Sequence, residues 1–297
     1  MRSSIRESDT DPTRRRESEW RRALRRIRKN RLAVAGFAIT GILILLAILA
    51  PTIAPYSPTK MSLPDRLSPP SASHPFGTDD AGRDILSRVI YGSRITLRIC
   101  IMVVGLTLAI GTMLGIVSGY IGGWVDEFIM RLNDVFLAFP ALILAMAIAA
   151  ALGPSLENAI IAMVVIWWPR YARVARGQVL AIREIDYVTS ARALGATSFR
   201  IMVHHILPNC VSPIVVQATL DLGEVVLTAA TLSFIGFGAQ PPAPEWGAMI
   251  SVGRNFLRDY WWYPTFPGLA ILVTVMGFNL LGDAVRDLLD PRLRRGV

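Results

Sequence analysis

The chain has 297 residues and a formal net charge of +9, with 53% hydrophobic and only 18% charged residues. Its mean hydropathy of +0.45 excludes an ordinary soluble domain and indicates a membrane protein. Both lysines, Lys29 and Lys60, lack the following Ser or Thr of a GxxxxGK(S/T) phosphate loop. We therefore expect no nucleotide hydrolysis by that machinery in this chain, and any ATP-driven activity requires another subunit.

Residues 1–31 form a basic tail that holds 12 of the 31 basic residues. The positive-inside rule places such a tail in the cytoplasm. A cleaved signal peptide is the first alternative, but the tail and the uncharged run of 19 residues after it exceed a short basic region and an apolar region of about 7 to 15 residues. A nucleic-acid-binding arm is the second. Orientation and contact with anionic lipid explain the tail better, and we expect no nucleic-acid partner.

The apolar runs predict an all-α, polytopic transmembrane protein with six spanning helices and both termini in the cytoplasm. The first span covers residues 32–50, a proline-rich outer loop covers 51–94, and a core over 95–282 contains five more spans before a cytoplasmic tail over 283–297. The five spans of the core are 95–117, 135–152, 159–168, 211–237 and 265–282.

The span over 159–168 is only about half the usual length of about 20 residues, so the charge balance of the loops decides it. Without this span, segment 170–208 and its six arginines would lie outside the membrane. With it, all six lie inside, as the positive-inside rule requires. Five basic residues in the outer loop oppose this orientation.

The outer loop contains seven prolines, which exclude a continuous helix up to about His74. Residues 77–99 then favour a helix, in which Asp84 and Arg88 are spaced for an i,i+4 ion pair. Later in the chain, the aromatic cluster 260–263 is typical of anchoring at the lipid–water boundary.

The longest inner connection, 170–208, predicts a helical stretch to about Leu194, a break at Gly195 and a second stretch that ends near Pro208. A short helix that projects into the cytosol is a shape that docks into a groove of a partner. His204 and His205 do not indicate a metal site, because adjacent side chains point to different faces of a helix and no third ligand is near in sequence.

Thr189, Ser190 and Ala191, then Gly195, then Leu207 and Pro208 match in spacing the "EAA, three residues, G" loop and the closing Leu-Pro of bacterial ABC-importer permease subunits. The chain resembles the dipeptide and oligopeptide branch of this family, in its C-type subunit. Four further segments carry that resemblance: HPFGTDDAGRDILSRVIYGSR, GGWVDEFIMRLNDVFLAFP, LSFIGFGAQPPAPEWGAMI and FNLLGDAVRDLLDPRLR.

The resemblance implies a type I ABC-importer permease fold and an ATPase-coupling role for the six matching loop residues. Thr189 stands where the family has Glu, so the ion pair of that Glu is not carried over. Gly195 also fits an ordinary helix terminator, a reading that does not exclude docking.

The implied partners are a second homologous permease, two cytoplasmic ATPases that bind ATP and magnesium, and an extracytoplasmic protein that delivers di- or oligopeptides. Surrounding lipid is a further partner, and no cofactor is expected in this chain itself. Import of nickel chelates or glutathione is the alternative within the family. A self-contained secondary transporter is the alternative outside it, although we find no internal repeat.

Asp221 and Glu224 lie inside the fifth predicted span on one helix face. Carboxylates inside the bilayer are costly and mark pathways or partners. One hypothesis is that they line the transport pathway and attract the ammonium group of a peptide. The other is a buried polar contact with the second permease or with another helix, by way of Asn279. A membrane enzyme built on this pair would lack a histidine or metal partner.

Overall fold

A computed structural model describes residues 30–289 of the chain, so most of the basic tail and residues 290–297 lie outside the described part. The described residues form helices joined by loops, and an isolated bridge between Thr78 and Asp84 is the β-pairing among them. The α-helices are α2 (Arg31–Ile53), α3 (Ile85–Ile121), α4 (Gly123–Leu137), α5 (Ala141–Leu152), α6 (Leu156–Ile182), α7 (Asp186–Ala193), α8 (Ser198–Ile201), α9 (Leu207–Ile235), α10 (Trp246–Gly253) and α11 (Trp262–Leu289).

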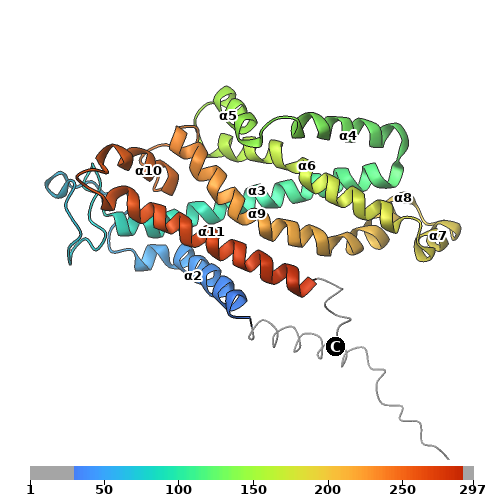
Figure 1. Ribbon diagram of the computed structural model, residues 1–297, viewed down its shortest axis with the longest axis horizontal. Helices are drawn as coiled ribbons and strands as arrows, with labels where there is room; N and C mark the ends of the chain where they lie inside the picture. The colour runs from blue at the N-terminus through green and yellow to red at the C-terminus, as the bar shows by residue number, and fades with distance from the viewer. Residues whose placement is uncertain (1–29, 290–297) are drawn as a thin grey trace, which may run out of the picture.

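The long helices lie side by side in an elongated bundle, with α2 and α11 on one side and α4 and α5 on the other (Figure 1). By length and composition, four of the described helices can cross a membrane, and the bent pair α4–α5 would be a fifth span. α6 is the remaining long helix of the six expected. It packs against α3, α5 and α9 along the bundle.

The expectation of one continuous helix over 135–152 is wrong. α4 ends at Leu137, α5 begins at Ala141, and their axes differ by 92°. Pro140 is the N-cap of α5, with φ −58° and ψ 121°. A proline has no N–H to donate and disfavours the helical conformation of the residue before it, so the chain bends at this point.

α6 is longer than expected, and segment 170–208 is not one loop. The helix has 27 residues and continues to Ile182, so Arg170, Arg173 and Arg176 lie inside a helix rather than in a loop. These three arginines lower the hydropathy of its carboxyl-terminal half. Each pairs with a carboxylate of another helix, as described below, and this pairing makes such charges tolerable at membrane depth.

The most extensive helix contact of the bundle joins α3 to α6. Gly111, Gly115 and Gly119 repeat at intervals of four residues and form one stripe along α3. A Cβ at Gly115 would lie 2.3 Å from the carbonyl oxygen of Ala172, which faces it from α6. The stripe therefore allows the two backbones to approach closely, and Tyr171 is fully buried beside it.

The bundle presents different structures at its two ends. One end carries the proline-rich loop and α10, and the other carries α7 and α8 (Figure 1). The start of α2 packs against the end of α11, since a Cβ at Gly36 would lie 2.6 Å from the backbone nitrogen of Leu281. Both described chain ends run toward the end with α7, which fits the expected placement of both termini on one side.

Candidate functional site

The segment that leaves the bundle between α6 and α9 is called the elbow here, over residues 183–201. It contains α7, then Gly195 with φ +82°, then α8. The N–H of Ala196 donates to the carbonyl of Ala191 across this glycine, which closes the end of α7. Thr197 caps α8 by accepting from the N–H of Arg200. Gly195 therefore terminates a helix by adopting a left-handed conformation that side chains disfavour.

The elbow exposes large apolar side chains at its tip and anchors itself with others at its base. Leu194 is 88% exposed and Phe199 is 72% exposed, whereas Val188 and Ile201 are fully buried. A side chain added at Gly195 would meet open space. Exposed apolar side chains that are clustered in this way mark a surface for a partner.

Polar contacts hold the elbow against the ends of the bundle helices. The Arg183 guanidinium donates to the carbonyl of Gly119 at 2.9 Å, and that of Arg192 lies 5.7 Å from the ring centroid of Tyr120. The Tyr187 hydroxyl accepts from the side-chain amide of Asn209 at 3.1 Å. The elbow is thus a positioned element, with both of its flanks tied to helices.

The expected second stretch does not end near Pro208. After α8, one turn of π-helix over Met202–Ile206 leads into α9, whose first residues are Leu207 and Pro208. The three segments follow one another without a break, so Ser198–Ile235 is one helix of 38 residues that passes through Pro208. Of the six loop residues predicted to couple, Thr189, Ser190, Ala191 and Gly195 lie on the elbow, and Leu207 and Pro208 lie at the foot of α9.

A cluster of three charged residues, Arg170, Asp221 and Glu224, lies near the middle of α6 and α9 and is called the mid-bundle cluster. The Arg170 guanidinium donates to both carboxylate oxygens of Glu224, at 2.6 and 2.9 Å. One Arg170 nitrogen lies 3.8 Å from a carboxylate oxygen of Asp221, which also accepts from the Gln217 amide at 2.8 Å. The two predicted carboxylates therefore meet an arginine that the sequence alone placed in a cytoplasmic loop.

Exposure differs within the mid-bundle cluster. The side chains of Arg170 and Glu224 are 35% and 46% exposed, whereas Asp221 is 3% exposed as a residue. Asn279, proposed as a partner of the carboxylates, packs instead against the glycine between them, because a Cβ at Gly223 would lie 2.4 Å from the Asn279 side-chain oxygen. The cluster thus opens toward a face of the chain that its own helices leave uncovered.

Two further ion pairs continue along α6 toward the elbow. Arg173 contacts Asp134 at 2.9 Å, and Arg176 contacts Asp126 at 2.6 Å, so α4 supplies both carboxylates. The first pair is about 60% exposed, and the second is partly buried. All three arginines of α6 are therefore neutralised by residues far away in sequence.

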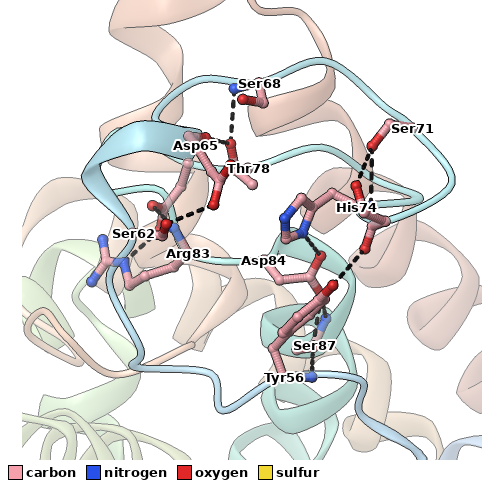
Figure 2. A network of polar contacts seen from close by, with 12 residues as sticks. Tyr56, Ser62, Asp65, Ser68, Ser71, His74, Thr78, Arg83, Asp84 and Ser87 are labelled. Atoms are coloured by element: carbon pink, nitrogen blue, oxygen red, sulfur yellow. Dashed lines mark hydrogen bonds and ion pairs between the residues drawn. The ribbon is translucent and has the colours of Figure 1, made fainter.

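Residues 54–84 form a folded cap at the end of the bundle opposite the elbow. Asp79 is fully buried and accepts from the backbone N–H groups of Ala81 and Arg83, and the Arg83 guanidinium donates to it at 2.6 Å. Thr78 accepts from the N–H of Ser68 and donates to the carbonyl of Asp65. Figure 2 shows Thr78 between Ser68 and Asp65, in a contact that folds the loop on itself.

The expected pair between Asp84 and Arg88 is replaced by other partners. Asp84 caps α3 by accepting from the N–H of Ser87, and it lies 2.9 Å from a ring nitrogen of His74. The Tyr56 hydroxyl donates to the carbonyl of Ser73 beside this pair (Figure 2). Asp84 therefore joins the cap to the start of a membrane helix.

Arg88 joins the cap to the loop before α10. Its side chain is 4% exposed, lies 3.5 Å from a carboxylate oxygen of Asp79, and donates to the carbonyls of Pro58 and Pro242. Two members of the aromatic cluster complete the contact. Trp262 and Tyr263 are buried rather than placed at the lipid boundary, and the Tyr263 hydroxyl donates to Asp80 at 2.8 Å.

A cavity of about 340 Å³ lies between α2, α3 and α11, away from the mid-bundle cluster. Ser93 and Thr274 are the polar side chains of its lining, and the rest is apolar apart from the Trp246 indole. Such a lining suits hydrocarbon rather than a charged solute. Among residues 30–289, no group of three histidine, cysteine or carboxylate side chains is placed to hold a metal ion.

The sequence indicated most of the residues of these sites but not which residues contact each other. Arg170 was visible, but nothing in its local pattern links it to Glu224, 54 positions away. The glycine stripe of α3 was a signal that the sequence did offer, because small residues at four-residue intervals in an apolar span indicate close helix packing.

Two family models match this chain. Residues 111–295 match the binding-protein-dependent transport system inner membrane component, and residues 18–70 match the N-terminal transmembrane domain of oligopeptide transport permease C. Together they cover the first span and the bundle from the last third of α3 onward.

Similar proteins are known from several bacteria. The dipeptide transport system permease protein DppC of Alkalihalophilus pseudofirmus is 46% identical, over 93% of this chain and 91% of that protein. The probable D,D-dipeptide transport system permease protein DdpC of Escherichia coli is 49% identical, over 88% of each chain. The glutathione transport system permease protein GsiD of Pectobacterium atrosepticum is 43% identical, over 93% of this chain and 92% of that protein.

Among solved structures, inward-facing MetNI, a methionine ABC transporter, contains a chain with a TM-score of 0.55 at 20% sequence identity. The match covers 69% of this chain and 97% of that chain. This likeness concerns the fold, and it agrees with the expected type I ABC-importer permease fold.

Proposed function

Because this chain belongs to the family of binding-protein-dependent transport system inner membrane components, we propose that it forms half of a translocation pathway for di- or oligopeptides. It is a multi-pass permease subunit of an ATP-driven importer in the inner membrane. The peptide substrate rests on its similarity to permeases named for dipeptide and D,D-dipeptide transport.

The observation that carries the coupling role is the exposed elbow. In this proposal Thr189, Ser190, Ala191 and Gly195 rest in a cleft of a cytoplasmic ATPase, with Leu207 and Pro208 at the hinge into α9. Leu194 and Phe199 supply apolar surface that an ATPase groove would cover. Because α6 and α9 both leave from the elbow, movement of the ATPase would reach the membrane bundle through two long helices.

The proposed assembly contains a second homologous permease, two ATPases and an extracytoplasmic substrate-binding protein. ATP and magnesium would be bound by the ATPases and not by this chain. The pathway would run along the face that carries Asp221 and Glu224, between the two permeases, in contact with surrounding lipid elsewhere.

A glutathione importer is the second candidate, because a permease named for glutathione transport is similar over most of both chains. Nickel chelates are the third substrate class. A secondary transporter, the alternative from outside the family, is not supported, because the chain belongs to a binding-protein-dependent transport family. Glutathione and dipeptides share free ammonium and carboxylate groups, so the same charged face suits both.

Uptake by the complete transporter tests these candidates. The chain would be reconstituted in proteoliposomes with its second permease, ATPases and binding protein, and uptake of labelled dipeptide, glutathione and a nickel chelate would be compared with and without ATP. We expect ATP-dependent uptake of the dipeptide. If only glutathione or only the nickel chelate were taken up, that compound would replace the dipeptide as the assigned substrate. Uptake driven by a proton gradient without ATP would contradict the proposal.

A further inference from the structure

We propose that the mid-bundle cluster is a binding site for a short zwitterionic peptide, in which Arg170 holds the carboxylate of the peptide while Glu224 holds its ammonium group and the buried Asp221 adds negative charge behind it. In the empty site Arg170 and Glu224 pair with each other, and an arriving peptide displaces this ion pair. This inference rests on the proposed function, because it assumes that peptides reach this face of the chain.

The first observation is geometric. Arg170 offers two parallel N–H groups that already bind a carboxylate at 2.6 and 2.9 Å. This planar, bidentate geometry suits any carboxylate, including the free end of a peptide. Both partners of the pair are partly exposed, at 35% and 46%, so a solute on the open face can reach them without repacking the bundle.

The second observation is the charge of the cluster. One guanidinium faces two carboxylates, which leaves an excess of one negative charge if both are ionised. Asp221 is 3% exposed, and the Tyr171 hydroxyl, adjacent in sequence to Arg170, lies beside its carboxylate as a hydrogen-bond donor. The side chain of Glu224 is 46% exposed, so the excess negative charge can be reached at this carboxylate. An ammonium group would supply three donors to it.

The third observation is the broken span beside the cluster. The side-chain amide of Asn133 donates to the carbonyl of Pro169 at 3.0 Å, and the rings of Phe136 and Trp168 lie 5.6 Å apart. The end of α4 is therefore at the same height as Arg170. Non-helical backbone at membrane depth is tolerated where it lines a polar cavity or is covered by protein.

The energetic argument is one of exchange. When a zwitterion displaces the internal pair, Arg170 exchanges one carboxylate for another and Glu224 exchanges a guanidinium for an ammonium group. No charge is left unpaired in a region where an unpaired charge is strongly disfavoured. A peptide amide lacks the carboxylate, so its binding would leave Arg170 without a full partner. The site therefore discriminates by penalising the wrong ligand as well as by rewarding the right one.

The test is a binding measurement on the membrane complex purified with its second permease and ATPases, without the soluble binding protein. The probes are labelled L-alanyl-L-alanine and its C-terminal amide. We expect the free dipeptide to bind about tenfold or more tightly than the amide, as for a charged hydrogen-bonded pair. The double variant Arg170→Gln with Glu224→Gln should lose that preference. The neighbouring exposed pair provides the matched control, and Asp134→Asn with Arg173→Gln should keep it.

A second variant separates binding from folding. Glu224→Gln removes the internal competitor of Arg170, so it should raise the affinity for N-acetyl-L-alanyl-L-alanine, which carries a carboxylate and no ammonium group. A merely structural ion pair would give no such gain.

Equal binding of dipeptide and amide by the native complex, no measurable dipeptide binding, or an unchanged double variant would overturn the inference. Loss of the second permease from the purified double variant would also overturn it, in favour of an assembly contact. These outcomes are distinct from failure of the proposed function, because the latter is the absence of ATP-dependent peptide uptake by the native transporter. If ATP-dependent uptake persisted but the complex bound the dipeptide and its amide equally, the binding site would be rejected and the proposed function would stand.

Discussion

At one end of the bundle the cap buries its charged side chains, whereas at the other end the elbow exposes its apolar ones. Asp79 is fully buried in the cap and Arg88, which contacts it from α3, is 4% exposed, while Leu194 is 88% exposed on the elbow. In an isolated chain both arrangements are costly unless partners compensate. The buried charges of the cap find their partners within the chain, whereas the apolar side chains at the tip of the elbow do not. The tip of the elbow is therefore left for another protein to cover.

The same contrast suits the two ends of the chain to different roles. Arg88 ties the start of α3 both to the cap and to the loop before α10, so buried contacts connect the cap to the membrane helices. The elbow is fixed at both flanks but free at its tip. A rigid cap and a projecting elbow are what a subunit requires if movement of a cytoplasmic partner is to be transmitted through the bundle.

The largest effect is expected from Asp79→Ala in the cap. This change leaves Arg83 and Arg88 buried without their carboxylate, which costs about 3 to 5 kcal/mol in the free energy of unfolding. Thermal unfolding in detergent should show a large fall in melting temperature or a loss of folded protein. Lys60→Ala, on the exposed surface of the same cap, is the control and should change little. Unchanged stability of the Asp79 variant would remove the basis for a self-contained cap.

The next effect should appear at the elbow, without a change in stability. Leu194→Asp places a charge on a tip that packs against nothing in the chain, so the melting temperature should stay the same. Retention of the ATPases by the purified complex should fall, because a buried apolar anchor of an interface is worth about 2 kcal/mol or more. Leu63→Asp is the matched control, since Leu63 is 75% exposed in the cap. If both variants retained the ATPases equally, the contrast between an elbow that binds a partner and a cap that does not bind it would be wrong.

A smaller effect is expected at His74. Replacing it by alanine removes one partner of Asp84, which still accepts from the N–H and hydroxyl of Ser87. The loss should be about 1 kcal/mol, as for a single hydrogen bond, and should be seen in chemical denaturation. His204→Ala, at an exposed position near the elbow, should have no measurable effect. A fall as large as that of Asp79→Ala would show that His74 holds the whole cap.

The smallest effect concerns pH and Glu245, the N-cap of α10. Burial raises the pKa of this carboxyl above its ordinary value of 4.5, although hydrogen bonds from Gly247 and Ala248 oppose the shift. The folded chain therefore retains a proton that the unfolded chain has lost. This contribution to stability is complete below the ordinary pKa and is lost as the pH rises through the raised pKa.

Glu245→Gln should accordingly reduce the dependence of the melting temperature on pH in the mildly acidic range. Glu184→Gln, at an exposed carboxylate of the elbow, is the matched control and should leave the dependence unchanged. The same pH dependence in the native chain and the Glu245 variant would assign it to other groups.

The sequence predicted the long apolar helices well, because a run of about twenty apolar residues has the length and composition of a membrane-spanning helix. It failed at Pro140, where uninterrupted apolarity concealed the break between α4 and α5. It also failed at Arg170, because the rule that assigns arginines to loops ignores carboxylates on distant helices. Local spacing suggested Asp84 and Arg88 as a pair, whereas tertiary contacts gave each a different partner.

The same limit of local patterns decided which parts of the candidate site could be predicted. Gly195 carries its own local signal, since a glycine after a helical stretch predicts a left-handed terminus. The cap carried no such signal. Its buried network depends on Asp79, Arg83 and Asp84 finding partners across a proline-rich segment, and their pairing follows from the folded path of the chain.

The most direct test of the coupling role is purification of the native complex and of a Gly195→Trp variant in mild detergent, with the subunits identified by mass spectrometry. A tryptophan at this position must adopt a disfavoured backbone conformation and would project into open space, where an ATPase is expected to dock. We predict that the variant retains the second permease and loses the ATPases. A variant complex that keeps its ATPases and its ATP-driven uptake would contradict the assignment of the elbow.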